Sequence, residues 1–246
     1  MIRRRRVAVV ALSAAIAVAG SAIALKPGSR PPATNEAKPS LLLLTSLPIL
    51  FGEGFQLDTE PSPVLARLER DYRVEAIAAA DRDSLARGRL LLMAQPRAQP
   101  AELLVALDQW VRRGGRLLLL ADPHLDWPSE KPLGDLSRPP ASFADTGLLG
   151  HWGLELAGPQ SSGPAAIDVG SYEIAVASAG RLASPQERCV VRAAKLIAHC
   201  RIEHGRVTVI ADADFLNLGG ASAIDGPTEH NLDLLESELV SLSRPD

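Results

Sequence analysis

Residues 89–123, RLLLMAQPRAQPAELLVALDQWVRRGGRLLLLADP, decide the fold class of this chain. Two apolar runs, at 89–94 and 116–121, flank a segment from Pro100 to Arg113 that ends before a Gly-Gly pair. Apolar residues recur in this segment at helical spacing, namely Leu103, Leu104, Leu107, Trp110 and Val111. Because the flanking runs are almost wholly apolar, they are typical of parallel strands buried on both faces of a sheet. The stretch therefore predicts a strand–helix–strand unit.

The pattern continues outward from this unit on both sides. From about 153 to 205, short extended runs predict an antiparallel excursion, which ends in a hairpin with its turn at His204-Gly205. The other predicted elements are strands at 41–46 and 72–77, a helix from Ser62-Pro63 to Arg70, a strand at 206–211 and a closing helix at 229–242. Alternating strands and helices of this kind predict an α/β domain over residues 40–246.

The first 25 residues predict an export signal. Arg3 to Arg6 precede Val7 to Leu25, a segment of 19 residues without charge. This order sends the rest of the chain across the bacterial inner membrane, into the periplasm. Two interpretations stay open: Ala22-Ile23-Ala24 fits a cleaved signal peptide, whereas 19 apolar residues suffice for a retained transmembrane helix. Residues 26–39, rich in proline and polar residues, predict a linker between this segment and the domain.

The charge balance limits the partners of the chain. The 246 residues carry a formal net charge of −3, and without Arg3 to Arg6 the balance is 22 basic against 29 acidic side chains. An acidic body argues against a nucleic-acid partner. Aromatic residues make up only 4% of the chain, so the core is expected to be aliphatic.

Four segments occur in an order that resembles a known group of proteins. They are LVALDQWVRRGGRLLLLADP, LLGHWGLEL, GRVTVIADADFLN and NLDLLESEL. In these segments the chain resembles the extracytoplasmic domain of gliding-motility ABC-transporter auxiliary proteins and the related DUF4350 group. The resemblance covers roughly residues 40 to 243 and is carried by structural rather than catalytic motifs. It implies a class I glutamine-amidotransferase-like fold, which is a flavodoxin-like three-layer α/β sandwich, here with an antiparallel excursion.

The residues that amidotransferase chemistry needs are missing from the sequence. A nucleophilic cysteine would stand on a sharp strand-to-helix turn, beside a histidine base. The corresponding turn, residues 95–100, reads QPRAQP and holds no Cys, Ser or Gly. The chain also contains no G-x-S-x-G, no G-x-G-x-x-G and no G-x-x-x-x-G-K-[ST] motif. We therefore expect no enzymatic activity and no cofactor.

Acidic residues follow two of the predicted strands. In an open parallel sheet, ligands gather beyond the carboxyl ends of the strands. The candidate ligand-binding residues there are Asp122, His124, Asp126, Asp212 and Asp214. Two hypotheses compete: carboxylates with an imidazole suit a divalent metal, but Asp after a strand also caps the next segment by accepting backbone N–H bonds. The sequence favours capping, so no metal is expected.

The chain holds two cysteines, Cys189 and Cys200. Exported chains with two cysteines often pair them, and a loop of this length is worth roughly 2–3 kcal/mol in the chain-entropy model. The pair would have to lie on adjacent strands. We therefore treat Cys189 and Cys200 as a disulfide candidate.

The expected function follows from the family resemblance and from the absence of catalytic and nucleotide-binding motifs in the sequence. It is a non-enzymatic, exported, membrane-associated binding or scaffold domain, accessory to an ABC-type envelope transport system. Its partner would be a transporter permease or another envelope protein. The alternatives are a degenerate amidotransferase-like hydrolase or metal-binding domain that uses the acidic strand ends, and an assembly subunit without any ligand.

Overall fold

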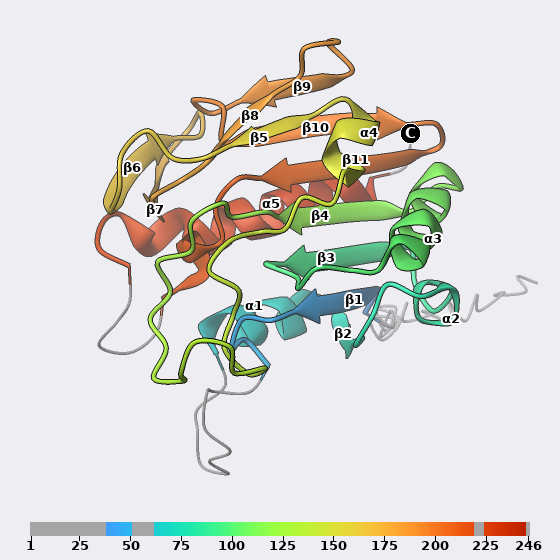
Figure 1. The fold of residues 1–246 in the computed structure, drawn as a ribbon, viewed down its shortest axis with the longest axis horizontal. Helices are drawn as coiled ribbons and strands as arrows, with labels where there is room; N and C mark the ends of the chain where they lie inside the picture. The colour runs from blue at the N-terminus through green and yellow to red at the C-terminus, as the bar shows by residue number, and fades with distance from the viewer. Residues whose placement is uncertain (1–37, 51–61, 219–223, 245–246) are drawn as a thin grey trace, which may run out of the picture. The chain divides into compact units, whose positions relative to one another are not determined.

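The computed structural model describes residues 38–50, 62–218 and 224–244. Their central element is a seven-stranded sheet (Figure 1). Its strands are β1 Ser40–Thr45, β2 Arg73–Ala76, β3 Leu90–Ala94, β4 Arg116–Leu120, β9 Cys189–Arg192, β10 Ile197–Ile202 and β11 Gly205–Ile210. They lie in the order β2-β1-β3-β4-β11-β10-β9. The first five in this order are parallel, and β10 is antiparallel to both of its neighbours.

Helices cover both faces of this sheet. The helices are α1 Pro63–Asp71, α2 Arg82–Leu85, α3 Ala101–Arg112, α4 Leu148–Trp152 and α5 Asn231–Ser243. Buried side chains form two clusters, one including α1 and α5, the other including α2, α3 and α4. All five residues of β3 are buried. Because burial of one leucine stabilises the fold by about 1.5–3 kcal/mol, the apolar parallel strands account for much of its stability.

The predicted strand–helix–strand unit is β3, α3 and β4. Leu91 of β3 pairs with Leu117 of β4 in a parallel ladder. The helix ends at Arg112, and Gly114, two residues later, has a φ of +103°, a left-handed conformation that glycine adopts easily. The prediction of a mixed α/β domain built on a parallel sheet is confirmed.

The segment between β4 and β11 contains the antiparallel part. It includes β5 Glu155–Ala157 paired with β8 Arg181–Ala183, and β6 Pro164–Asp168 paired with β7 Glu173–Ala177. The β6–β7 ribbon packs through Ile174 and Val176 onto the cluster that holds α5. The chain then forms β9, β10 and β11, and β11 returns beside β4 as expected.

The turn of the last hairpin lies one residue earlier than predicted. Ile202 pairs with Gly205, so Glu203 and His204 form the turn and Gly205 begins β11. Glu203 takes the left-handed conformation, with φ of +52°. Gly205 is needed for another reason: a Cβ there would lie 2.0 Å from the carbonyl oxygen of Val111. The glycine marks a close approach of two backbones rather than the turn.

The predicted N-terminal apolar helix, Val7 to Leu25, and most of the predicted linker lie outside the described residues. Among the residues described, no helix is long and apolar enough to cross a membrane.

Candidate functional site

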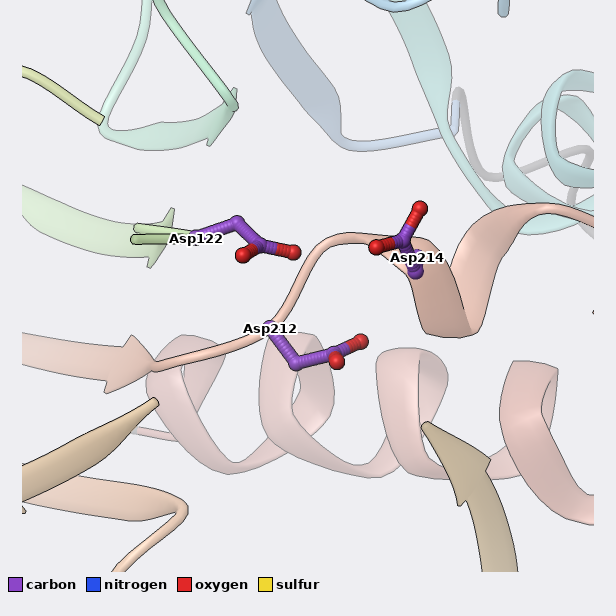
Figure 2. A group of neighbouring side chains, drawn as sticks. All are labelled: Asp122, Asp212 and Asp214. Atoms are coloured by element: carbon purple, nitrogen blue, oxygen red, sulfur yellow. The ribbon is translucent and has the colours of Figure 1, made fainter. Parts of the chain in front are cut away.

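The carboxyl ends of β4 and β11 bring three acidic side chains together (Figure 2). Because these strands are neighbours, Asp122 after β4 lies beside Asp212 after β11, and Asp214 begins the short helix η1 Asp214–Leu216. Each of the three offers a carboxylate oxygen within 4.8 Å of the other two. Asp122 and Asp212 are 0% exposed and Asp214 is 2% exposed. We call these three residues the acidic cluster.

Backbone N–H groups donate to most of the oxygens of the acidic cluster. Asp122 accepts from His124 through Oδ1 and from Ala213 through Oδ2, both at 2.8 Å. Asp212 accepts from Phe215 at 2.8 Å and from Ala177 at 3.1 Å. The two carboxylates thus tie the loop after β4, the end of β7 and η1 to one another. This is the capping arrangement that the sequence favours.

The other two candidates from the sequence, His124 and Asp126, lie at the rim. The Asp126 backbone N–H donates to Asp214 Oδ2 at 2.7 Å, but its side chain turns away and accepts from the hydroxyl of Ser178. The His124 side chain is 55% exposed and lies 3.5 Å from Asp126 Oδ1. The structure therefore unites Asp122, Asp212 and Asp214 and leaves His124 and Asp126 outside the cluster. Pro123 breaks the alternation that would have aligned them.

The acidic cluster has unusual proton affinity. Burial raises the pKa of Asp122 to about 6 and that of Asp214 to about 8, and it raises the pKa of Asp212 well above its ordinary value. Neighbouring carboxylates add to the rise for Asp212 and Asp214, while backbone hydrogen bonds oppose it. A side-chain hydrogen bond links Asp214 to Asp122. These shifts favour the protonated form of the cluster relative to isolated carboxylates.

Three carboxylates at this spacing have the chemistry of a divalent-cation site. Against this use, five of the six carboxylate oxygens already accept a backbone N–H: both of Asp122, both of Asp212 and one of Asp214. In the described part of the chain, the hydrogen bonds of the acidic cluster hold together the segments that follow β4 and β11 and the end of β7.

Gln95, directly after β3, is a further polar residue at this edge. Its φ is +44°, a left-handed conformation that costs a non-glycine residue about 1–2 kcal/mol, and it is 0% exposed. Its Nε2 donates to the carbonyl oxygens of Asp122 and Pro140, both at 3.1 Å, and its Oε1 accepts from the Asp122 N–H at 3.0 Å. Gln95 therefore connects the end of β3 to the loop after β4 through side-chain hydrogen bonds.

Sequence reasoning missed the role of Gln95, although it examined this turn. The only local signal is a polar residue between an apolar strand and Pro96. Proline disfavours the right-handed helical conformation in the residue before it, which indicates a turn but not a left-handed one. The two partner residues of the side chain, Asp122 and Pro140, are distant from it in sequence, so no local pattern predicts these contacts.

No protein-family model and no curated protein matches the chain. Solved structures do resemble it. The mmIFT52 N-terminal domain has a TM-score of 0.56 at 13% identity, over 84% of this chain and 98% of that one. Cytoplasmic protein STM1381 from Salmonella typhimurium LT2 has a TM-score of 0.53 at 12% identity, over 83% and 100% of the two chains.

A third similar structure belongs to a larger protein. Gan42B, a GH42 β-galactosidase from G. stearothermophilus, has a TM-score of 0.50 at 14% identity, over 85% of this chain. This chain spans about a third of the length of that enzyme, since the match covers 31% of it. At such low identities these likenesses establish a shared fold and nothing about activity.

Proposed function

We propose that this chain is a non-enzymatic binding or scaffold domain, exported and associated with the inner membrane, that serves an ABC-type envelope transport system. The strand order β2-β1-β3-β4-β11 agrees with the flavodoxin-like order, in keeping with a class I glutamine-amidotransferase-like fold. The resemblance of four segments to gliding-motility auxiliary proteins supplies the transporter context. The uncharged segment from Val7 to Leu25 supplies the membrane association.

The observation that carries the non-enzymatic part of the proposal is Gln95. In an amidotransferase-like fold the nucleophile stands on the sharp turn after a central strand, exposed to the substrate and beside a base. Here the turn after β3 has the left-handed backbone of such a residue, but it holds a glutamine that is fully buried. Its amide is engaged by Asp122 and Pro140. A position used in this way serves the fold and leaves no room for a nucleophile.

The experiment is purification of the full chain, with a C-terminal tag, from membranes of its native host in mild detergent. We expect a transporter permease or ATPase in comparable amount. An unrelated tagged protein with the same residues 1–37 is the control, because it reveals association through the N-terminal segment alone. A chain that purifies without any transporter subunit contradicts the proposal.

The acidic cluster supports the alternative function, a metal-binding or degenerate hydrolase domain. A half-open hollow of about 450 Å³ adjoins the cluster, and its lining includes Asp126, Asp214 and Asn217. Under this alternative, Asp214→Asn abolishes metal-dependent turnover of an amide, ester or glycoside substrate. Under the proposed function the purified wild-type chain shows no such turnover, with or without added metal.

A further inference from the structure

The antiparallel side of the seven-stranded sheet, away from β2, ends in the exposed edge strand β9. β9 is the last strand of the seven-stranded sheet, beyond β10, and no strand of the described part pairs with its outer side (Figure 1). Exposed edges are normally protected, because their unpaired backbone groups accept strands from other chains. Val190, in the middle of β9, is an apolar side chain that is 63% exposed.

The register shows which backbone groups of β9 point outward. Cys189 lies opposite Cys200, and their Cα atoms are 4.3 Å apart, the separation of a pair that does not exchange hydrogen bonds. The backbone groups of Cys189 therefore point away from β10, those of Val190 toward it, and those of Val191 away again. The Cys189 N–H already donates to Ser184 Oγ at 3.1 Å. The N–H and C=O of Val191 therefore point outward at the edge.

The edge strand β9 is fixed in position in the free chain. A disulfide joins Cys189 to Cys200 and fixes β9 in register with β10. The turn between the two strands contains three consecutive residues with left-handed backbones, Ala193, Ala194 and Lys195, with φ of +51°, +51° and +75°. Such a turn is unfavourable without glycine, so the hairpin depends on a constraint elsewhere. Preorganisation by the disulfide lowers the entropy lost when a strand is added.

Basic side chains flank this edge. Arg188 directly precedes β9, and Arg192 is its last residue. His199 of β10 lies opposite Val190, with its Nε2 3.3 Å from Arg192 Nη2. The Arg192 side chain is 60% exposed and lies 3.8 Å from Glu238 Oε1, a loose ion pair. Two hollows meet at Arg192, of about 580 Å³ and about 350 Å³. The smaller hollow is locally basic, since its lining includes Arg192, His199 and Arg206 and no carboxylate, whereas the larger also includes Asp168 and Glu238.

We propose that β9 binds an extended acidic segment of a partner protein, which adds to the sheet as an eighth strand. Val191 supplies the main-chain hydrogen bonds, Val190 supplies an apolar contact, and Arg192 pairs with a carboxylate of the added strand. A second copy of this chain is disfavoured in the register that pairs two β9 strands about Val190, because that register sets Arg192 of each strand against Arg188 of the other. The inference rests on the proposed function, since it names the surface that a binding domain would use.

The test uses the full chain in detergent micelles and a synthetic peptide of alternating glutamate and valine. A peptide with lysine in place of glutamate is the matched control. We measure binding by titration calorimetry and the exchange of the Val191 amide by hydrogen–deuterium exchange. The acidic peptide is expected to bind saturably and to slow exchange at Val191 at least about tenfold, and the lysine peptide is expected to do neither.

Two pairs of variants separate edge pairing from a general loss of structure. Val191→Pro removes the outward N–H, whereas Val191→Ala removes the same side-chain packing and keeps the N–H. We expect Val191→Pro to abolish binding and Val191→Ala to retain it. Arg192→Glu should weaken binding at least about tenfold, while Arg73→Glu, on the opposite edge strand β2, should leave it unchanged.

Several results would overturn the inference. They are no binding of the acidic peptide, equal binding of the lysine peptide, unchanged binding by Val191→Pro, or a dimer of the free chain that Val191→Pro dissociates. Failure here is distinct from failure of the proposed function. If transporter subunits still purify with Val191→Pro in undiminished amount, the chain is a scaffold that uses another surface.

Discussion

The carboxyl ends of β4 and β11 and the outer side of β9 are two edges of one sheet, and they differ in how their polar groups are used. At the first edge, Asp122 and Asp212 accept two backbone N–H bonds each and are fully buried. At the second edge, Val191 presents backbone groups outward beside the exposed Arg192. The first edge is where α/β proteins usually bind ligands, and the second is where they usually do not.

The location of a polar residue in the fold is therefore weaker evidence for a ligand-binding site than whether its hydrogen bonds are already made within the protein. A buried group whose hydrogen bonds are complete contributes to stability and has little left for a ligand. An exposed group with bonds still to make can contribute to binding.

The largest effect is expected from Asp212→Ala. The substitution leaves the buried N–H groups of Phe215 and Ala177 without an acceptor, at about 1–3 kcal/mol each. We expect a loss of about 4 kcal/mol in the free energy of unfolding, measured by urea denaturation of the full chain. Asp168→Ala is the control, since Asp168 is exposed and accepts from the Gly170 N–H in a hairpin turn. A loss below about 1 kcal/mol for Asp212→Ala would mean that the acidic cluster is not a structural lock.

The second effect is a pH dependence that resides in the acidic cluster. Burial raises the pKa of Asp214 to about 8, so the folded chain retains a proton that the unfolded chain loses near its ordinary pKa of 3.8. Stability is therefore lost as pH rises from about 4 and levels off above about 8, and about 3 kcal/mol of this loss falls between pH 6 and pH 9 for this one group.

Asp214→Asn tests the origin of this slope. The amide keeps an acceptor for the Asp126 N–H and cannot ionise, so the variant should lose most of the decline between pH 6 and pH 9. Asp145→Asn, in an exposed turn, should keep the wild-type slope. Urea denaturation at several pH values makes the measurement. A slope that Asp214→Asn leaves unchanged would place the titration elsewhere.

The third effect concerns the open edge. Replacing both Cys189 and Cys200 by alanine should lower the free energy of unfolding by about 2–3 kcal/mol, the value for a loop of this length. It should also speed amide exchange along β9 and its strained turn, while the buried amides of Ala213 and Phe215 keep their protection. Hydrogen–deuterium exchange makes both observations. Faster exchange at Ala213 and Phe215 by the same factor would show that the two edges unfold together.

Local patterns predicted most of the parallel half of this fold. The unbroken apolar runs of β3 and β4 allow only a doubly covered strand, and Gly114 ends α3 whatever its surroundings. Neighbouring strand ends then bring Asp122 and Asp212 together, as the sequence indicated.

The remaining features depend on contacts between distant segments. Gln95 is held in its left-handed conformation by Asp122 and Pro140, which a local pattern does not contain. Gly205 was assigned to the turn because glycine favours turns, whereas it is needed where the backbone of Val111 approaches. The outward direction of Val191 follows from a register that the disulfide fixes. The sequence shows which polar residues are present, but whether their hydrogen bonds are satisfied depends on tertiary contacts.

The most direct test of the central claim is thermal unfolding of the wild-type chain, Asp122→Asn and Asp212→Asn, with chelator and with added Mg²⁺, Mn²⁺ or Zn²⁺. A cation that binds the folded chain raises its melting temperature by mass action. If the acidic cluster is a structural lock, no metal shifts the wild type, and Asp122→Asn, whose amide keeps only one of the two acceptor oxygens used by His124 and Ala213, costs about 1–3 kcal/mol. A wild-type shift of several degrees that disappears in both variants would contradict the account and make the carboxyl edge a metal site.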